Sequence, residues 1–337
     1  MKRRSGPSNF WQNMAMRLGL IIAIALVVQA VLFGQTAEEV RHEGSWSGPT
    51  FDRGYVIDWE RRHEMGAYTL YAPDGTKLYS TSPSQLGFVK TLFEGLAADT
   101  DGTVAAIRHI FDPWQLEGTI LLIDSSGKPG LTIHTGAHLP TRICFANDHS
   151  IWTVGYEYGK DDFLVFHHFS RDGQQLGAFV EWSDIACGFN AMSTLQGKVG
   201  GGWTLRVSKD RLGLSVPSGF LKEKWIEVSL SGNLIGQWEW DFDRSLNFGP
   251  VAFTASNVLY AQVWNYERPI GYAIFDRNTK TWKKVKGYPK GRLLGADQDD
   301  LVFSEEDGGW TILHRIPSGA VHIISGKRAQ QFEPREH

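Results

Sequence analysis

The chain has 337 residues, of which 42% are hydrophobic and 21% are charged, and its formal net charge is −3. This length and composition indicate a globular protein with a substantial core. The small negative charge argues against nucleic acid as a partner and gives no strong field for steering a charged ligand.

The first forty residues have the pattern of an export signal. An apolar run over residues 18–33 follows four basic residues, Lys2, Arg3, Arg4 and Arg17. Positive charge before a short apolar segment is typical of secretory leaders. The run could also cross a membrane by tilting or by thinning the bilayer. A cleaved signal peptide and a retained membrane anchor therefore both stay open over residues 1–40, and either places the rest of the chain outside the cytoplasm, in a periplasm or secreted.

Six segments further along the chain share one pattern, in which two β-rich apolar runs flank a polar turn. They begin at Tyr68, Thr119, Phe163, Trp225, Gly271 and Trp310. Turn dipeptides such as Asp74-Gly75 and Ser126-Gly127 reach positive φ easily and reverse the chain between strands. The recurrence predicts six β-hairpins and a repeat architecture.

A second pair of β-like runs precedes each hairpin, which gives units of four antiparallel strands repeating every 40–55 residues or so, as in propeller blades. The predicted blades begin near Gly48, Gly95, Ile143, Asn190, Val251 and Leu293. We therefore expect an all-β fold: a six-bladed β-propeller over residues 41–325, preceded by one N-terminal apolar helix and followed by a tail over residues 326–337. A two-sheet sandwich and a β-helix explain six matching hairpins less well.

Two motifs within the second unit resemble those of a known superfamily. Residues 96–104 follow the form A-x-D-x-D-G-T-V, residues 121–128 end in D-x-x-G-K, and residues 169–173 echo them. The chain thus resembles six-bladed propellers of the NHL, TolB and gluconolactonase-like superfamily over roughly residues 48–325. The resemblance implies a fold and no activity. Glu94-Gly95 is followed by Leu96 where gluconolactonase-like enzymes have proline, so no metal site is transferred and no cofactor is expected.

The loops between second and third strands should share one face of the disc with the loops that join blades, where ligands commonly bind. These loops are rich in aromatic and charged residues, a combination typical of recognition surfaces. The predicted ligand-binding residues are Arg61, His63, His109, Trp114, Tyr156, Glu157, Trp264, Tyr266 and Arg268. They predict a non-enzymatic protein that recognises a protein, peptide or glycan. The competing interpretation is that the charges are merely solvated and the aromatic rings cap blade packing.

The sequence contains histidine and acidic residues that could support catalysis, but no catalytic residue is assigned. His167 and His168 are neighbours on one strand, so they should face opposite ways and cannot share a metal. His109, His134 and His138 could gather with Asp112 around zinc, and the acidic residues between 297 and 307 could bind calcium. An alternative function is therefore a metal-dependent hydrolase or lactonase with an axial active site.

The two cysteines, Cys144 and Cys187, lie too far apart in the sequence for a metal-binding pair. Two buried thiols and one disulfide both stay open, since an exported protein could keep a disulfide oxidised.

Overall fold

The computed structural model describes residues 49–60, 67–88, 93–112, 115–185, 204–219, 222–241, 247–265, 268–285, 291–307, 310–316 and 321–325. The predicted leader or anchor over residues 1–40 and the tail over residues 326–337 lie outside these ranges. Within them the protein is almost entirely β-structure, with one four-residue helix, α2 (Trp182–Ile185). None of the described helical segments has the length and hydropathy of a membrane span.

The strands form six antiparallel sheets, each made of four consecutive strands. Sheet 1 contains β1 (Pro49–Asp52), β2 (Tyr55–Glu60), β3 (Ala67–Tyr71) and β4 (Lys77–Thr81). Sheet 2 contains β5 (Phe93–Ala98), β6 (Val104–Asp112), β7 (Gln115–Ile123) and β8 (Pro129–His134). Sheet 3 contains β9 (His138–Phe145), β10 (Ile151–Glu157), β11 (Leu164–Phe169) and β12 (Gln175–Glu181).

The second half of the chain repeats this arrangement. Sheet 4 contains β13 (Thr204–Val207), β14 (Arg211–Gly219), β15 (Lys222–Ser229) and β16 (Leu234–Asp241). Sheet 5 contains β17 (Asn247–Phe253), β18 (Leu259–Asn265), β19 (Arg268–Asp276) and β20 (Thr281–Lys284). Sheet 6 contains β21 (Arg292–Asp297), β22 (Asp300–Asp307), β23 (Trp310–Ile316) and β24 (Val321–Ser325).

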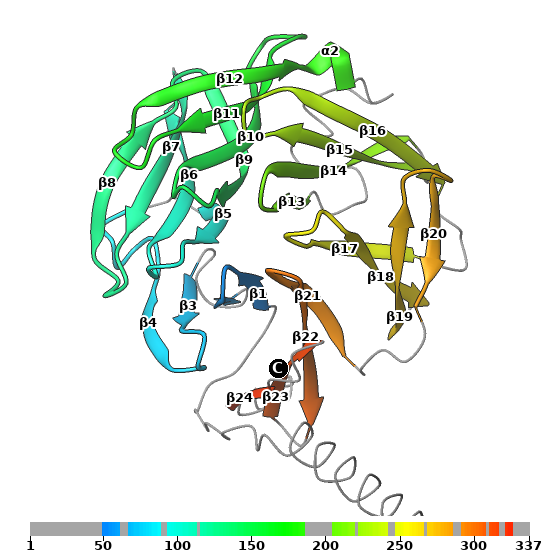
Figure 1. Cartoon of the computed structure of the whole chain (residues 1–337). Coiled ribbons are helices and arrows are strands. Elements are labelled where there is room, and N and C mark those ends of the chain that lie inside the picture. The colour runs from blue at the N-terminus through cyan, green and yellow to red at the C-terminus, as the bar shows by residue number, and fades with distance from the viewer. Residues whose placement is uncertain are drawn as a thin grey trace, which may run out of the picture. The chain divides into compact units, whose positions relative to one another are not determined.

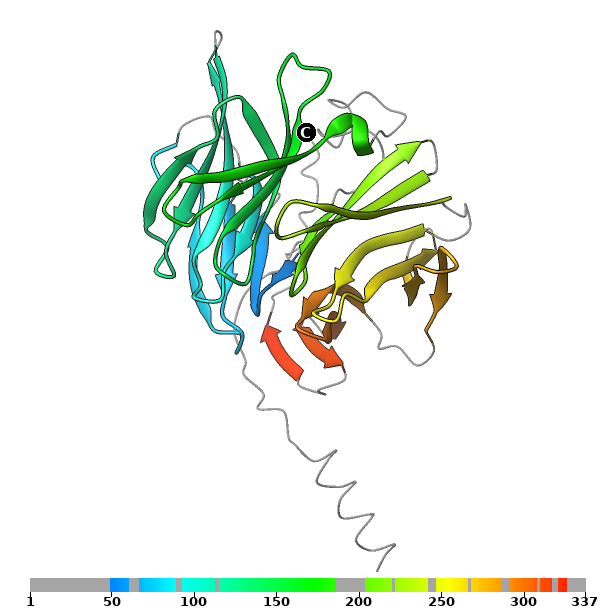
Figure 2. The same ribbon diagram turned by 45° about the horizontal axis from the view of Figure 1, so that its top comes forward.

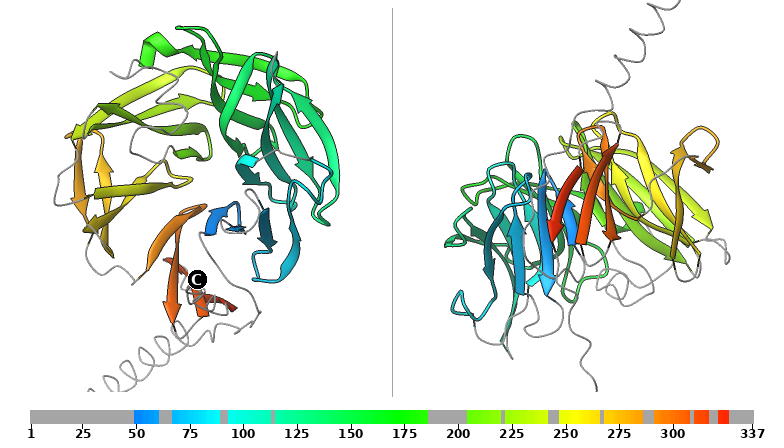
Figure 3. Two further views of the ribbon diagram at one scale, coloured as in Figure 1. Left: turned by 180° about the vertical axis from the view of Figure 1, so that it is seen from behind. Right: turned by 90° about the horizontal axis from the view of Figure 1, so that it is seen from below.

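The sheets stand around a common centre, with the first strand of each nearest the middle (Figure 1). The inclined view and the view from below show the sheets standing beside one another around this centre (Figures 2 and 3). First strands contact one another in sequence from β5 through β9, β13 and β17 to β21, and β21 contacts β1. Sheet 1 meets sheet 2 through β2 and β5. The chain thus returns on itself, and its first described sheet packs against its last.

Apolar side chains fill each space between neighbouring sheets. Six clusters of buried residues are present, and each draws mainly on one adjacent pair of sheets. In the cluster between sheets 4 and 5, the rings of Trp225 and Phe253 meet edge to face with centroids 5.4 Å apart. Large aromatic rings bury the most surface per residue and favour this geometry. A four-stranded sheet cannot bury both faces alone, so packing around a centre is what stabilises it.

A buried carboxylate adds a polar link between sheets 4 and 5. Glu227 in β15 is fully buried. It accepts hydrogen bonds from Trp225 Nε1 at 2.9 Å, from Arg211 at 3.1 Å and from Arg277 Nε at 3.0 Å. Arg277 belongs to the turn between β19 and β20 of sheet 5. A buried charge needs such partners, because transfer from water is otherwise very costly.

The hairpin turns form where the sequence predicts them. Gly75 and Gly127 both have a φ of 84°, in the left-handed region that glycine tolerates best. The turn predicted at Ser318-Gly319 lies outside the described residues.

The predicted all-β propeller of four-stranded antiparallel blades is confirmed, which excludes the sandwich and the β-helix. Five of the six sheets are identified as blades, so the count of six blades stays a prediction. The start predicted at Ile143 was wrong, because β9 begins at His138 and runs through Pro140. Proline is tolerated there because β9 is an edge strand that pairs only with β10. The start predicted at Asn190 lies outside the described residues.

Candidate functional site

A cavity of about 540 Å³ lies at the centre of the sheets, lined by residues of all six first strands and by the turns that follow them. Its volume falls within the range of small-molecule sites. Five basic residues line it: Arg53, Arg142, Arg206, Lys209 and Arg292. Three acidic residues line it as well: Asp52, Glu94 and Asp297. We refer to this space as the axial cavity.

Two arginines lie on neighbouring strands of the cavity wall. Arg142 in β9 donates a hydrogen bond to the carbonyl of Thr141 at 2.6 Å, and Arg206 in β13 donates to the carbonyl of Leu205 at 3.2 Å. Burial lowers the pKa of both guanidinium groups. Removal from water therefore raises the free-energy cost of each positive charge above its cost on the surface. Each guanidinium group should attract negatively charged partners strongly.

Asp52, the last residue of β1, faces the same space. Its Oδ2 accepts a hydrogen bond from the backbone N–H of Ala98 at 3.0 Å, which links sheets 1 and 2. Burial raises the pKa of Asp52 to about 6, although the Ala98 N–H, Arg206 and Arg53 oppose the rise. A carboxyl that titrates near neutrality in a cavity is typical of functional sites.

We expect Asp52→Asn to become more stabilising, relative to the wild type, as pH rises. The pKa of Asp52 is higher in the folded than in the unfolded protein. Ionisation of Asp52 therefore lowers the free energy of unfolding as the pH rises from about 4 to about 7, by up to about 3 kcal/mol. Asparagine avoids this cost and can still accept the Ala98 hydrogen bond. Urea unfolding at several pH values measures the difference. Asp161→Asn, at an exposed position, is the control, and a difference for Asp52→Asn that does not change with pH would contradict the argument.

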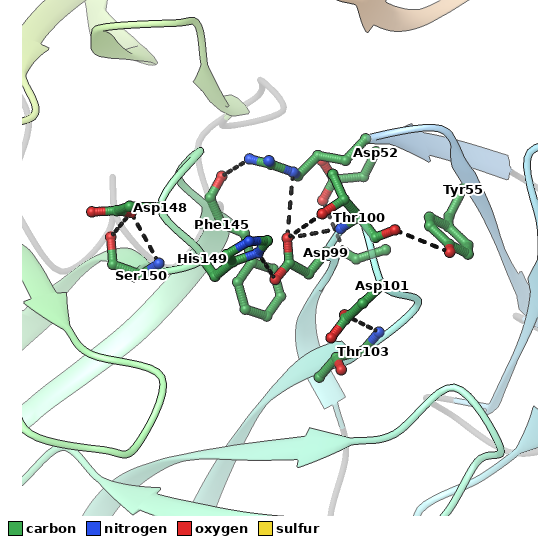
Figure 4. A network of polar contacts seen from close by, with 12 residues as sticks. Asp52, Tyr55, Asp99, Thr100, Asp101, Thr103, Phe145, Asp148, His149 and Ser150 are labelled. Carbon is green, nitrogen blue, oxygen red and sulfur yellow. Dashed lines mark hydrogen bonds and ion pairs between the residues drawn. The ribbon is translucent and has the colours of Figure 1, made fainter.

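A polar network at the turn end of the cavity ties three sheets together (Figure 4). Asp99 is fully buried and follows β5. His149 Nδ1 lies 2.8 Å and Arg171 Nη1 lies 3.0 Å from its Oδ2, and Arg53 Nε lies 3.6 Å from its Oδ1. Arg53 also donates to the carbonyl of Phe145 at 3.1 Å. Asp99 therefore serves as an anchor for cations from sheets 1 and 3.

The other turns at this end are joined in the same way. Asn147 Nδ2 donates to the carbonyl of Lys209 at 3.2 Å, between sheets 3 and 4. The backbone N–H of Ser256 donates to Asp299 at 2.8 Å, between sheets 5 and 6. Such bonds fix the positions of the turns, and therefore the shape of the cavity at this end.

The structure describes only some of the residues predicted to form a recognition surface. Arg61, His63, Trp114 and Tyr266 lie outside the described residues. Trp264 and Arg268 lie where β18 and β19 pair at their ends, and the structure describes the backbone of these two residues but not their side chains. The predicted set is therefore traceable only in part.

Three predicted residues have described side chains, and two of them are buried in packing positions. His109 is 8% exposed and its Nε2 lies 2.8 Å from the carbonyl oxygen of Pro140. Tyr156 is 4% exposed and belongs to the apolar cluster between sheets 3 and 4. Glu157 pairs with Lys160 in the loop after β10. For His109 and Tyr156 the geometry matches the interpretation that loop rings cap blade packing.

Three of the described histidines pack against other aromatic rings. The rings of His138 and His167 stack with centroids 3.7 Å apart, and His168 stacks on Trp152 at 4.1 Å. The prediction that His167 and His168 face opposite ways is confirmed. Burial is the main cause that lowers the pKa of His138 well below its usual value. Among the described residues, no group of three His, Cys, Asp or Glu side chains is placed to hold a metal ion.

The remaining candidates have structural surroundings. Cys144 is a buried free thiol on the cavity wall, and burial raises its pKa. Cys187 lies outside the described residues. In the acidic stretch, Asp297 pairs with Arg315, and Asp299 accepts hydrogen bonds from Ser256.

Sequence reasoning missed the charged wall of the axial cavity. Asp52, Arg142 and Arg206 each belong to a first strand in which apolar and small residues predominate. A charged residue in such a strand is the signal that could have identified the wall. Neither the models of known protein families nor the sequences of curated proteins match this chain.

Proposed function

We propose that this protein is a non-enzymatic binding propeller that takes a small polar ligand into its axial cavity, with all six sheets acting as blades of one ring. The observation that carries the proposal is a cavity of ligand size whose wall holds half-buried charged side chains. The contact between β1 and β21, and the apolar cluster that joins sheets 1 and 6, support the sixth blade. A closed ring fixes the wall, so little ordering entropy would be lost on binding.

On this proposal, the loop face predicted from the sequence would lie around the mouth of the same cavity. In an antiparallel sheet, the first strand begins at the end where the second strand finishes, so loops between second and third strands lie beside the starts of the first strands. Glu94 and Arg292 are at those starts, and both are exposed. The loop residues would contact any part of the ligand, or of a protein, peptide or glycan carrying it, that stays outside the cavity.

The proposed location outside the cytoplasm rests on the N-terminal pattern of the sequence. An uncut leader would also hold the protein at a membrane. The metal-dependent hydrolase is not proposed, because the described residues provide no set of metal ligands.

A cavity-filling substitution tests the function. Purified protein is screened by thermal shift against succinate, citrate, glucose 6-phosphate, glucose and spermidine, which cover anionic, neutral and cationic ligands. We expect at least one compound to raise the melting temperature, and Leu96→Trp on the cavity wall to abolish the rise. Leu131→Trp, on the exposed outer strand β8, is the matched control and should keep it. No rise with any compound, or a rise that survives Leu96→Trp, would overturn the proposal.

A further inference from the structure

We propose that the ligand of the axial cavity carries an oxyanion, a carboxylate or a phosphate group, and that Arg142 and Arg206 bind it. This inference rests on the proposed function and specifies its ligand class. The two arginines stand on β9 and β13, neighbouring first strands that contact one another. Both side chains line the cavity and are anchored by hydrogen bonds to the carbonyls of the residues that precede them.

Arg142 and Arg206 are neighbours on the cavity wall, and the positive charge of Arg206 acts on Arg142. Burial is the main cause that lowers the pKa of Arg142; Glu94 opposes this, and the charge of Arg206 adds to it. Two like charges held in a space of low dielectric are costly, and an anion between them relieves the cost. The fold therefore holds two cationic side chains on a part of the wall where binding of a negatively charged ligand is electrostatically favourable.

The three acidic residues of the wall offset only part of the charge of its five basic residues. Asp297 is already paired with Arg315, which approaches from β23. Asp52 faces Arg206, Arg53, Asp99 and Cys144, and burial raises its pKa to about 6. It therefore carries its charge mainly above about pH 6 and is protonated below that pH. Glu94 is exposed at the start of β5 and contributes a more screened charge.

The other basic residues of the wall have different parts in this arrangement. Arg53 is held by the Phe145 carbonyl and by Asp99, so we do not include it in the binding pair. Lys209 and Arg292 are exposed, and they place positive charge at opposite ends of the first strands. Positive charge at a cavity mouth attracts anions and speeds their association.

Guanidinium geometry suits this ligand class. Its planar fork matches the two oxygens of a carboxylate or phosphate, and such bonds are stronger than neutral ones. A cavity of about 540 Å³ is far larger than an inorganic ion. The fitting ligand is therefore an organic acid or a phosphate ester of metabolite size.

Isothermal titration calorimetry with citrate, glucose 6-phosphate and glucose tests the inference. We expect the two anions to bind and glucose not to bind, and their relative affinities distinguish the carboxylate from the phosphate source. Arg206→Gln and Arg142→Gln should each weaken anion binding at least about tenfold, the loss typical of one charged hydrogen-bonding partner. Lys284→Gln, on the exposed outer strand β20, removes an equal charge and should leave affinity unchanged.

A variant with increased affinity shows that changes in binding do not result from misfolding. Asp52→Asn removes the competing carboxylate, so it should tighten anion binding at pH 8 and have little effect at pH 5. The ratio of the Asp52→Asn affinity to the wild-type affinity should grow as the pH rises through about 6, where Asp52 loses its proton, and protonation of the ligand itself cancels in this ratio. Binding of glucose but of no anion, equal losses in Arg206→Gln and Lys284→Gln, or unchanged affinity in Asp52→Asn at pH 8 would overturn the anion inference. These outcomes contradict the anion inference alone. If none of the tested compounds binds, the proposed function is contradicted as well.

Discussion

Replacing Glu227 by alanine should lower the free energy of unfolding by about 3–5 kcal/mol, the cost typical of breaking a buried ion pair. Glu227 is fully buried, and its carboxylate is bonded to Arg211, Arg277 and Trp225. Without it, Arg277 and the indole N–H of Trp225 lose this acceptor, and Arg211 keeps only its exposed partner Asp210. Urea unfolding followed by far-UV circular dichroism measures the loss without relying on the nearby tryptophans.

Two matched variants separate charge from hydrogen bonding. Glu227→Gln keeps an acceptor for Trp225 but removes the negative charge, so it should cost less than the alanine variant. Glu239→Ala, on β16 of the same sheet, breaks an exposed pair with Lys222. That loss should stay below about 1 kcal/mol. Equal losses at positions 227 and 239 would show that the buried carboxylate has no special role.

Asp99→Ala should cause the second large loss, also about 3–5 kcal/mol. The buried carboxylate of Asp99 faces Arg53, Arg171 and His149, which come from two other sheets. Its removal leaves cations from sheets 1 and 3 without their shared anion. Because Arg53 and Asp52 are adjacent on the cavity wall, we also expect the turn end of the cavity to loosen, which hydrogen exchange of the backbone N–H of Ala98 would detect.

A double-mutant cycle attributes this loss to the network. Arg171→Met should cost clearly less in the Asp99→Ala background than in the wild type, since its main buried partner is then missing. Asp101→Ala is the control, because Asp101 binds the same arginine but is 49% exposed. Additive losses for Asp99 and Arg171 would contradict the network.

Much of the fold could be read from the sequence because its signals are local. A dipeptide such as Asp74-Gly75 sets a turn within a few residues, and alternating apolar positions set the strands around it. The first residue of each strand was harder to predict. The continuous apolar run of β9 begins at Ile143, whereas the buried residues of that strand begin at His138. The intervening segment contains Pro140, which hid the start of the strand.

The site was less predictable because it depends on contacts between distant parts of the chain. Arg53 and Phe145 are bonded although 92 residues separate them, and no local pattern brings Arg142 beside Arg206. Loop composition drew attention to His109 and Tyr156, which the structure buries in packing positions. The charged residues of the first strands became informative only once the strands were arranged around a centre.

The joining of sheets 1 and 6 has a consequence for how the protein assembles. Every described sheet uses four strands that follow one another in the chain, so within residues 49–325, as far as they are described, no strand is shared between the first and last sheets. The junction relies on side chains such as Phe51, Tyr71 and Leu294 rather than on a shared main-chain ladder. Each sheet can therefore form from its own stretch of polypeptide, and the cavity has its complete wall only when sheets 1 and 6 are in contact.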